Sequence, residues 1–296
     1  MSERSQVEPQ VLSGSILALT SALAFAFSNA SAIVAFHAGS NPLTLAAARF
    51  VLPALMLATW LTIQNRSVWL PTRDGWLAVG LGAITAGYTW ALLSAIAAIP
   101  LGLAILIFYL FPLVTTIILG ALGRERLGWK TIVAILVAFV GLALALDPRV
   151  GALNFGGVLL AFAAALGLGI VVAVSSRTFR AGDSRPLTLY LASVAAVLLI
   201  AFCALHGDLA LPNTINGWAG FVAAAFFYAF AMIAFFIAVS LVGPVRSSLL
   251  CYAEPVVSAG LGVALFGESL TFTQMAGIIL VIAALIWATQ LKPSPP

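Results

Sequence analysis

The sequence predicts an all-α integral membrane protein with ten transmembrane helices, arranged as two inverted five-helix repeats. Of its 296 residues, 63% are hydrophobic and only 7% are charged, against roughly 25% charged residues in an ordinary soluble domain. Apolar stretches of about 20 residues, the length that crosses a bilayer core about 30 Å thick, recur almost end to end. The polar breaks between them are short, and the second half of the chain repeats the first.

The apolar stretches define the predicted helices one by one. Lengths near 20, without the ten-residue alternation of an outer-membrane barrel, favour helices over strands. The first stretch follows Met1-Ser2-Glu3-Arg4 and is interpreted as a retained helix, not as a signal peptide. The predicted helices are 12–36, 43–63, 75–95, 101–121, 129–147, 155–175, 186–206, 217–240, 244–266 and 272–291.

The basic residues predict an orientation. The chain carries a net charge of +4. Apart from Arg49, inside a predicted helix, and Arg149, in an odd-numbered break, its arginines and lysines lie at the termini or the even-numbered breaks. Basic residues mark cytoplasmic loops, so both termini are predicted to be cytoplasmic, in a multi-pass protein of the cell (inner) membrane. Because membrane topology explains where the basic residues lie, nucleic acid is not a predicted partner. The predicted partner is the lipid bilayer.

An internal repeat divides the chain. Residues 106–112 align with residues 249–255 at an offset of 143, and in the same register Glu125 aligns with Glu268. The first repeat is predicted to span 12–147 and the second 155–291, with cytoplasmic tails at 1–11 and 292–296. Five helices per repeat is an odd number, so the second repeat enters the membrane inverted. In transporters built this way, substrate binds near the midplane between the halves.

The repeated segments resemble a known family. Residues 109–112, 123–129 and 141–142, with a second copy at 254–255, 267–270 and 277–280, resemble the EamA domain signature. Two tandem copies resemble the ten-helix drug/metabolite transporter superfamily, and within it the chain is most similar to the bacterial aromatic amino-acid exporters. The resemblance implies a secondary transporter that exports small metabolites such as amino acids, with alternating access through a central cavity.

Two charged residues within the predicted helices are candidate substrate or coupling residues. Glu254 lies about 15 Å into the ninth helix, close to the midplane, where a charge costs at least about 2.5 kcal/mol. Its carboxyl is expected to bind a substrate ammonium or a coupling proton, or to be hydrogen-bonded inside the bundle. Ser258 shares its helical face. Arg49 could bind a substrate carboxylate, pair with Glu254, or snorkel to the interface.

Aromatic residues and prolines complete the candidate site. Tyr88, Trp90, Tyr109 and Tyr228 could line a cavity for apolar or aromatic side chains, or serve only in packing. Tyr252 is the repeat counterpart of Tyr109 and joins this set. Pro112 and Pro255 occupy equivalent positions, where a missing amide donor is expected to kink the helix. We interpret both as hinges, with packing irregularity as the alternative.

The sequence offers little for an enzyme. No P-loop, His-Glu-x-x-His or acidic metal motif occurs, and the two histidines lie at opposite ends of different helices. No catalytic residue, cofactor or metal is therefore predicted. An intramembrane enzyme acting on a lipid-soluble substrate, and a channel or scaffold, stay open as alternatives. The sequence leaves the substrate, the coupling ion and the oligomeric state open.

Overall fold

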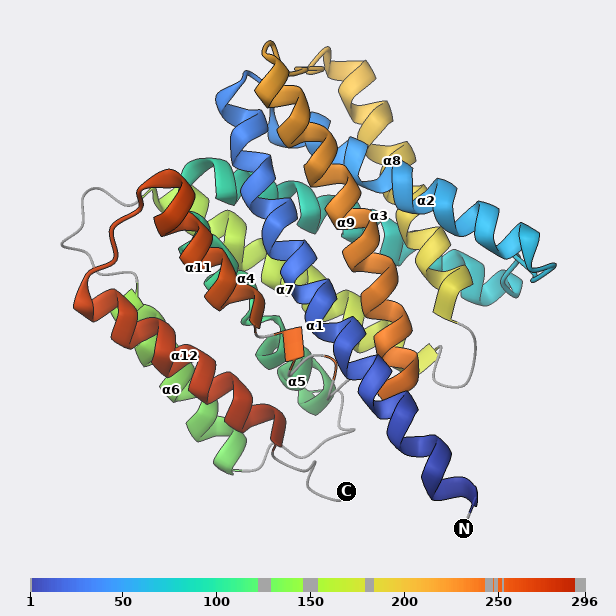
Figure 1. Cartoon of the computed structure of the whole chain (residues 1–296), viewed down its shortest axis with the longest axis horizontal. Helices are drawn as coiled ribbons and strands as arrows, with labels where there is room; N and C mark the ends of the chain where they lie inside the picture. The colour runs from blue at the N-terminus through green and yellow to red at the C-terminus, as the bar shows by residue number, and fades with distance from the viewer. Residues whose placement is uncertain are drawn as a thin grey trace.

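A computed structural model describes residues 2–121, 129–145, 154–178, 184–242, 247, 250–251 and 253–290. All regular secondary structure in these ranges is helical (Figure 1). The helices are α1 (Ser2–His37), α2 (Pro42–Ile63), α3 (Thr72–Ala98), α4 (Leu101–Phe108), α5 (Phe111–Ala121), α6 (Trp129–Ala145), α7 (Phe155–Thr178), α8 (Ser184–His206), α9 (Ile215–Val242), α11 (Ala253–Phe266) and α12 (Phe272–Gln290).

These helices confirm the predicted all-α fold and refine its boundaries. Six stretches are long and apolar enough to cross a membrane: 12–37, 42–63, 72–98, 155–175, 185–206 and 215–238. Shorter apolar helices occupy 101–115, 253–266 and 272–284. Helix α1 begins at Ser2, well before the predicted start at residue 12, because the helix continues through the polar segment that precedes its apolar part.

The predicted fourth helix is interrupted, which corrects the expectation of one continuous helix over 101–121. Tyr109 and Leu110 form a turn between α4 and α5, in which the Leu110 amide bonds the Ile107 carbonyl at 3.0 Å. Pro112 is the second residue of α5, a position in the first helical turn where its missing N–H is tolerated. A proline here cannot continue an existing helix without losing a bond, so the break falls just before it.

Helix packing follows the two-fold relation between the repeats. Helix α1 packs chiefly on α9, and α3, the counterpart of α9, packs on α7, the counterpart of α1. Helices α2 and α8 are counterparts that pack on each other, and so are α6 and α12. Helix α4 packs on α11, which is the counterpart of α5. Figure 1 shows α6 and α12 side by side at one flank. The contacts therefore join the two repeats throughout.

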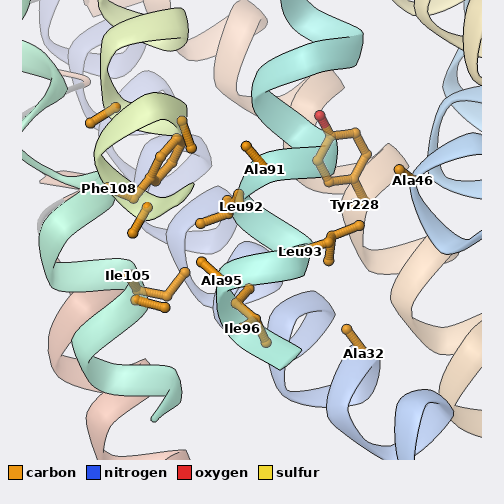
Figure 2. Packing of buried hydrophobic residues seen from close by; sticks show 14 of the residues in the cluster. Ala32, Ala46, Ala91, Leu92, Leu93, Ala95, Ile96, Ile105, Phe108 and Tyr228 are labelled. Carbon is orange, nitrogen blue, oxygen red and sulfur yellow. The ribbon is translucent and has the colours of Figure 1, made fainter. Parts of the chain in front are cut away.

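Small residues and hydroxyl groups hold the helices together. The Ser21 and Ser28 hydroxyls of α1 donate to the carbonyls of Ala231 and Ala224 on α9, at 2.9 and 2.7 Å. Close packing and interhelical hydrogen bonds of this kind drive helix association in a bilayer. In Figure 2, neighbouring side chains of α3 point to opposite sides, toward α4 and toward Tyr228 of α9.

One end of the bundle is closed by short, cross-linked connections. We call it the His37 end; it comprises residues 37–42, 98–101, 206–215 and 266–272. The Asn213 amide donates to the Ala38 carbonyl at 2.8 Å, and the Asn41 side chain donates to the Asp208 carbonyl at 2.6 Å. Gly39 turns the chain with a φ of +92°, a value that favours glycine. The first and second repeats thus meet tightly here.

Candidate functional site

A buried amide joins the two charged residues of the predicted site. Asn29, in the second half of α1, donates from Nδ2 to Glu254 Oε1 at 3.0 Å and accepts at Oδ1 from Arg49 Nη1 at 3.2 Å. The three side chains come from α1, α11 and α2 and are each 3% exposed or less. Asn29 therefore bridges a guanidinium and a carboxyl group that both lie deep inside the bundle.

The turn between α4 and α5 supplies the second partner of the carboxyl group. Tyr109 donates its hydroxyl to Glu254 Oε2 at 2.7 Å. Both Glu254 oxygens are thereby hydrogen-bonded, each to a residue of the first repeat. Because Tyr109 is the first residue after α4, the break before Pro112 sets where this hydroxyl lies. Pro112 therefore acts on the site indirectly, because it determines where α4 ends and so where Tyr109 lies.

Arg49 is held inside the bundle on three sides. Its Nη2 donates to the Ser28 carbonyl at 2.8 Å, and its guanidinium carbon lies 5.3 Å from the centre of the Tyr228 ring. The snorkelling alternative is therefore wrong: at 1% exposure the head group is turned inward. An arginine over a tyrosine face gains a cation–π attraction, which grows when the pair is desolvated. These contacts fix the orientation of the Arg49 guanidinium group.

Two buried polar atoms of this cluster, Arg49 Nε and Ser258 Oγ, have no hydrogen-bond partner. Ser258 follows Glu254 by one helical turn. A buried donor or acceptor without a partner costs about 1–3 kcal/mol. These two atoms leave hydrogen-bonding capacity for a polar ligand.

Aromatic rings flank the charged cluster. The Tyr228 ring meets Phe25 and Phe50 edge to face, at centroid distances of 5.7 and 5.3 Å. On the α4 side, the rings of Tyr88 and Phe108 stack at 6.2 Å. Edge-to-face and stacked pairs at these distances are favourable. They place an apolar wall beside the guanidinium.

The structure brings together some of the predicted site residues but not all of them. Glu254, Arg49, Tyr109 and Tyr228 meet in one cluster, with Tyr88 and Ser258 at its edge. Trp90 does not join it: the side chain is 42% exposed, on the same face of α3 as Gly80 and Gly87. Tyr252 lies outside the described residues. Pro255 is buried beside Glu254, and Pro112 opens α5.

Asn29 is the residue that sequence reasoning missed. Its signal was present, because Ser28-Asn29 is a polar pair inside the largely apolar stretch predicted as the first helix, 12–36. A polar residue at that depth is costly and normally faces the bundle interior. Within the part of the chain that the structure describes, no group of three metal-ligating side chains occurs.

Comparison with known proteins agrees with this architecture. The EamA-like transporter family matches residues 12–146 and again residues 155–290. The uncharacterized protein PA1977 of Pseudomonas aeruginosa is 28% identical over 260 residues, which cover 82% of this chain and 85% of that protein. A protein crystal structure superposes with a TM-score of 0.63 over 96% of both chains, at 21% identity. That likeness shows the fold.

Proposed function

Because the chain belongs to the EamA-like transporter family, and so is a multi-pass membrane transporter of small solutes, we propose that it exports amino acids with apolar or aromatic side chains. Transport is by alternating access between the two repeats. The observation that supports this substrate most directly is the buried Arg49 fork, whose Nε has no partner.

The guanidinium suits a carboxylate. Arginine presents its donors in a planar fork that binds a carboxylate through two parallel hydrogen bonds. In the structure, Nη1 and Nη2 are bonded to Asn29 and to the Ser28 carbonyl. A solute carboxylate bonded to Nε and to one Nη nitrogen would complete the donor set and would place the solute between α1 and α2.

Glu254 suits the other charge of an amino acid. Its carboxyl group accepts from Asn29 and Tyr109, and a carboxylate has about four lone-pair sites, so capacity remains for a substrate ammonium or a coupling proton. A zwitterion would match a site with one buried cation and one buried anion, since each charge would be compensated inside the bundle. Tyr228 and Tyr88, with the neighbouring phenylalanines, would hold an apolar side chain.

The two prolines are proposed as hinges. The break before Pro112 already separates α4 from α5, and Pro255 occupies the equivalent position in the second repeat. Bending at these points would change how the bundle ends open while leaving Glu254, which lies next to Pro255, in place. Alanine at either position should slow transport more than it weakens substrate binding.

A ligand series tests the proposed substrate. Phenylalanine should raise the melting temperature of the purified protein, whereas phenylalaninamide and phenethylamine, which lack the carboxylate, should not. Arg49→Lys should lower phenylalanine affinity about tenfold or more, because lysine keeps the charge but loses the fork. Arg66→Lys, an exposed arginine exchanged in the same way, is the matched control. Equal binding of the amide and the acid would contradict the proposal. Uptake by proteoliposomes then tests transport.

The orientation is likewise a proposal. The connection 64–71 carries Arg66, and Arg73 follows at the start of α3. The His37 end carries no arginine or lysine at residues 37–42, 98–101, 206–215 and 266–272. The positive-inside rule therefore puts the His37 end outside and both termini in the cytoplasm. A cysteine at the exposed Asp208 should label with an impermeant reagent in intact cells, and a cysteine at Ser67 should not.

A further inference from the structure

A second, half-buried carboxyl group lies away from the polar cluster, at the His37 end. Glu268 follows α11, where Gly267 takes a φ of +66° and turns the chain back. The Glu268 amide donates to the Gly262 carbonyl at 3.2 Å, which folds the residue over the last turn of α11. Its Oε1 accepts from the amide of Leu101, the first residue of α4, at 2.9 Å.

This contact crosses from one repeat to the other. Helix α4 belongs to the first repeat, and Pro100, its N-cap residue, supplies no side-chain hydrogen bond to the helix. The first N–H groups of a helix need a partner, and a carboxylate is favoured there by the helix dipole. Glu268 therefore provides, from the second repeat, the cap that the first repeat lacks.

The two helices are also in direct backbone contact at this point. A Cβ added to Gly102 would lie 2.9 Å from the Ala259 Cα atom. One layer further out, the His37 and Phe266 rings meet edge to face at 6.5 Å. Burial raises the pKa of the Glu268 carboxyl, and the amides of Leu101 and Gly102 act against that rise. The Glu268 carboxyl thus faces two backbone amides of α4 and is only partly exposed.

We propose that Glu268 is a latch that holds the His37 end of the bundle closed, by capping α4 across the interface between the repeats. The inference rests on the proposed function in one respect, because alternating access requires the repeats to separate at one end and then at the other. Opening of the His37 end must break the bond between Glu268 and Leu101.

The latch is specific to this end. At the offset of 143 that aligns Glu268 with Glu125, the residue equivalent to Leu101 is Pro244. Proline has no N–H to donate, so the same bond is not available between Glu125 and that position. The opposite end must therefore be closed by other contacts, and the two ends are expected to open with different ease.

Cysteine accessibility tests the latch. Ile105, one turn into α4, is fully buried, and Ile105→Cys can be labelled from the His37 end only when that end opens. In full-length protein with Cys203→Ala and Cys251→Ala, Glu268→Ala should raise the labelling rate about tenfold, the usual effect of losing a hydrogen bond to a charged group. Glu268→Gln keeps an acceptor oxygen and should label more slowly than Glu268→Ala.

A second variant removes the donor instead of the acceptor. Leu101→Pro copies the residue of the second repeat, and proline is well tolerated at the first position of a helix. It should raise Ile105→Cys labelling by less than Glu268→Ala does, because the Gly102 amide still faces the carboxyl. Asp208→Ala, which removes an exposed acid at the same end, should leave the rate unchanged.

A probe nearer the other end separates opening from general loosening. Val171→Cys, buried on α7, should not label faster in Glu268→Ala. Unchanged Ile105→Cys labelling in Glu268→Ala and Leu101→Pro, or an equal rise at both probes, would overturn the latch. The binding series on Arg49 is independent of these rates. Failure of the latch with phenylalanine binding intact therefore rejects only the latch, and the reverse result rejects only the substrate.

Discussion

The two repeats share one frame but differ where the polar cluster forms. In the second repeat Glu254 occupies the position of Phe111 in the first, and Arg49 in the first repeat corresponds to Ser193 in the second at an offset of 144. Helix contacts come in symmetric pairs, whereas each charge occurs once. A duplicated scaffold can therefore adopt two equivalent arrangements of helices. The site between the repeats still has a single orientation, because Arg49 and Glu254 each occur in one repeat only.

The largest effect should follow from removing one charge of the pair. Arg49→Met or Glu254→Leu alone leaves its partner buried without compensation, which costs about 3–5 kcal/mol. Each single variant should lose transport and melt at a much lower temperature. The double variant should melt near the wild-type temperature because neither charge remains, yet it should not transport. Thermal unfolding in detergent and proteoliposome uptake measure the two properties.

The double variant has apolar side chains at both charged positions, as the first repeat already has with Phe111 at the position equivalent to Glu254. If it transports as wild type does, the charged pair is structural and the candidate site is wrong. If the single variants are as stable as the double, the guanidinium and the carboxyl do not compensate each other, and the bridge through Asn29 carries no energetic weight.

The bridging amide should give the next largest effect. Asn29→Leu leaves Arg49 Nη1 and Glu254 Oε1 each short of a partner, a loss of about 1–3 kcal/mol in the free energy of unfolding. The position equivalent to Asn29, at the offset of 142 between Gly14 and Gly156, is Val171. Val171→Leu should therefore change stability by less. Similar losses in both variants would show that packing, not the amide, matters there.

A smaller effect is expected at the contact between α4 and α11. Gly102→Ala adds a methyl group against the backbone of Ala259, and overpacking of this kind costs roughly 1–3 kcal/mol. The helices should move apart, so the variant should also open the His37 end to Ile105→Cys labelling. Gly260→Ala, at a glycine with open space around its Cβ position, is the control. No change in melting temperature for Gly102→Ala would contradict the close packing.

The smallest effect should be a gain in stability. Gly80 and Gly87 lie within α3 on its exposed face, and a Cβ at either would meet nothing within 4 Å. Alanine there should stabilise the helix by about 0.5–1 kcal/mol, because glycine loses more backbone freedom on folding. The melting temperature of Gly80→Ala plus Gly87→Ala should rise slightly, with uptake unchanged. A fall would mean that this face packs against another molecule.

Hydropathy and the repeat predicted the fold because both depend on long stretches of sequence. Apolar length locates each helix, and the odd number of helices per repeat implies inversion. The break at Tyr109 was predicted only as a kink at Pro112, since the proline shows where a bond is lost but not which neighbour leaves the helix. Arg49 lies near the start of its helix, so its head group could have been expected at the membrane interface. The side chain instead turns inward and bonds Asn29 and the Ser28 carbonyl.

The site was harder to predict because it is assembled from four helices, α1, α2, α9 and α11, and from the turn between α4 and α5. Glu254 was recognised by the cost of its charge at the midplane. Asn29 was overlooked because an amide carries no charge, although its depth is similar. Trp90 was included for its chemistry alone, and only the packing of α3 reveals that it faces away from the cluster. Periodicity identifies faces of a helix but not the partners that cover them.

The pairing of α6 with α12 has a consequence for how the protein is made. These helices contact each other far more than anything else, and α6 receives the backbone of α12 at Gly141, whose Cβ position lies 2.9 Å from the Val281 amide nitrogen. During synthesis α12 emerges more than a hundred residues after α6. Helix α6 must therefore remain exposed to lipid until α12 is made and docks on it.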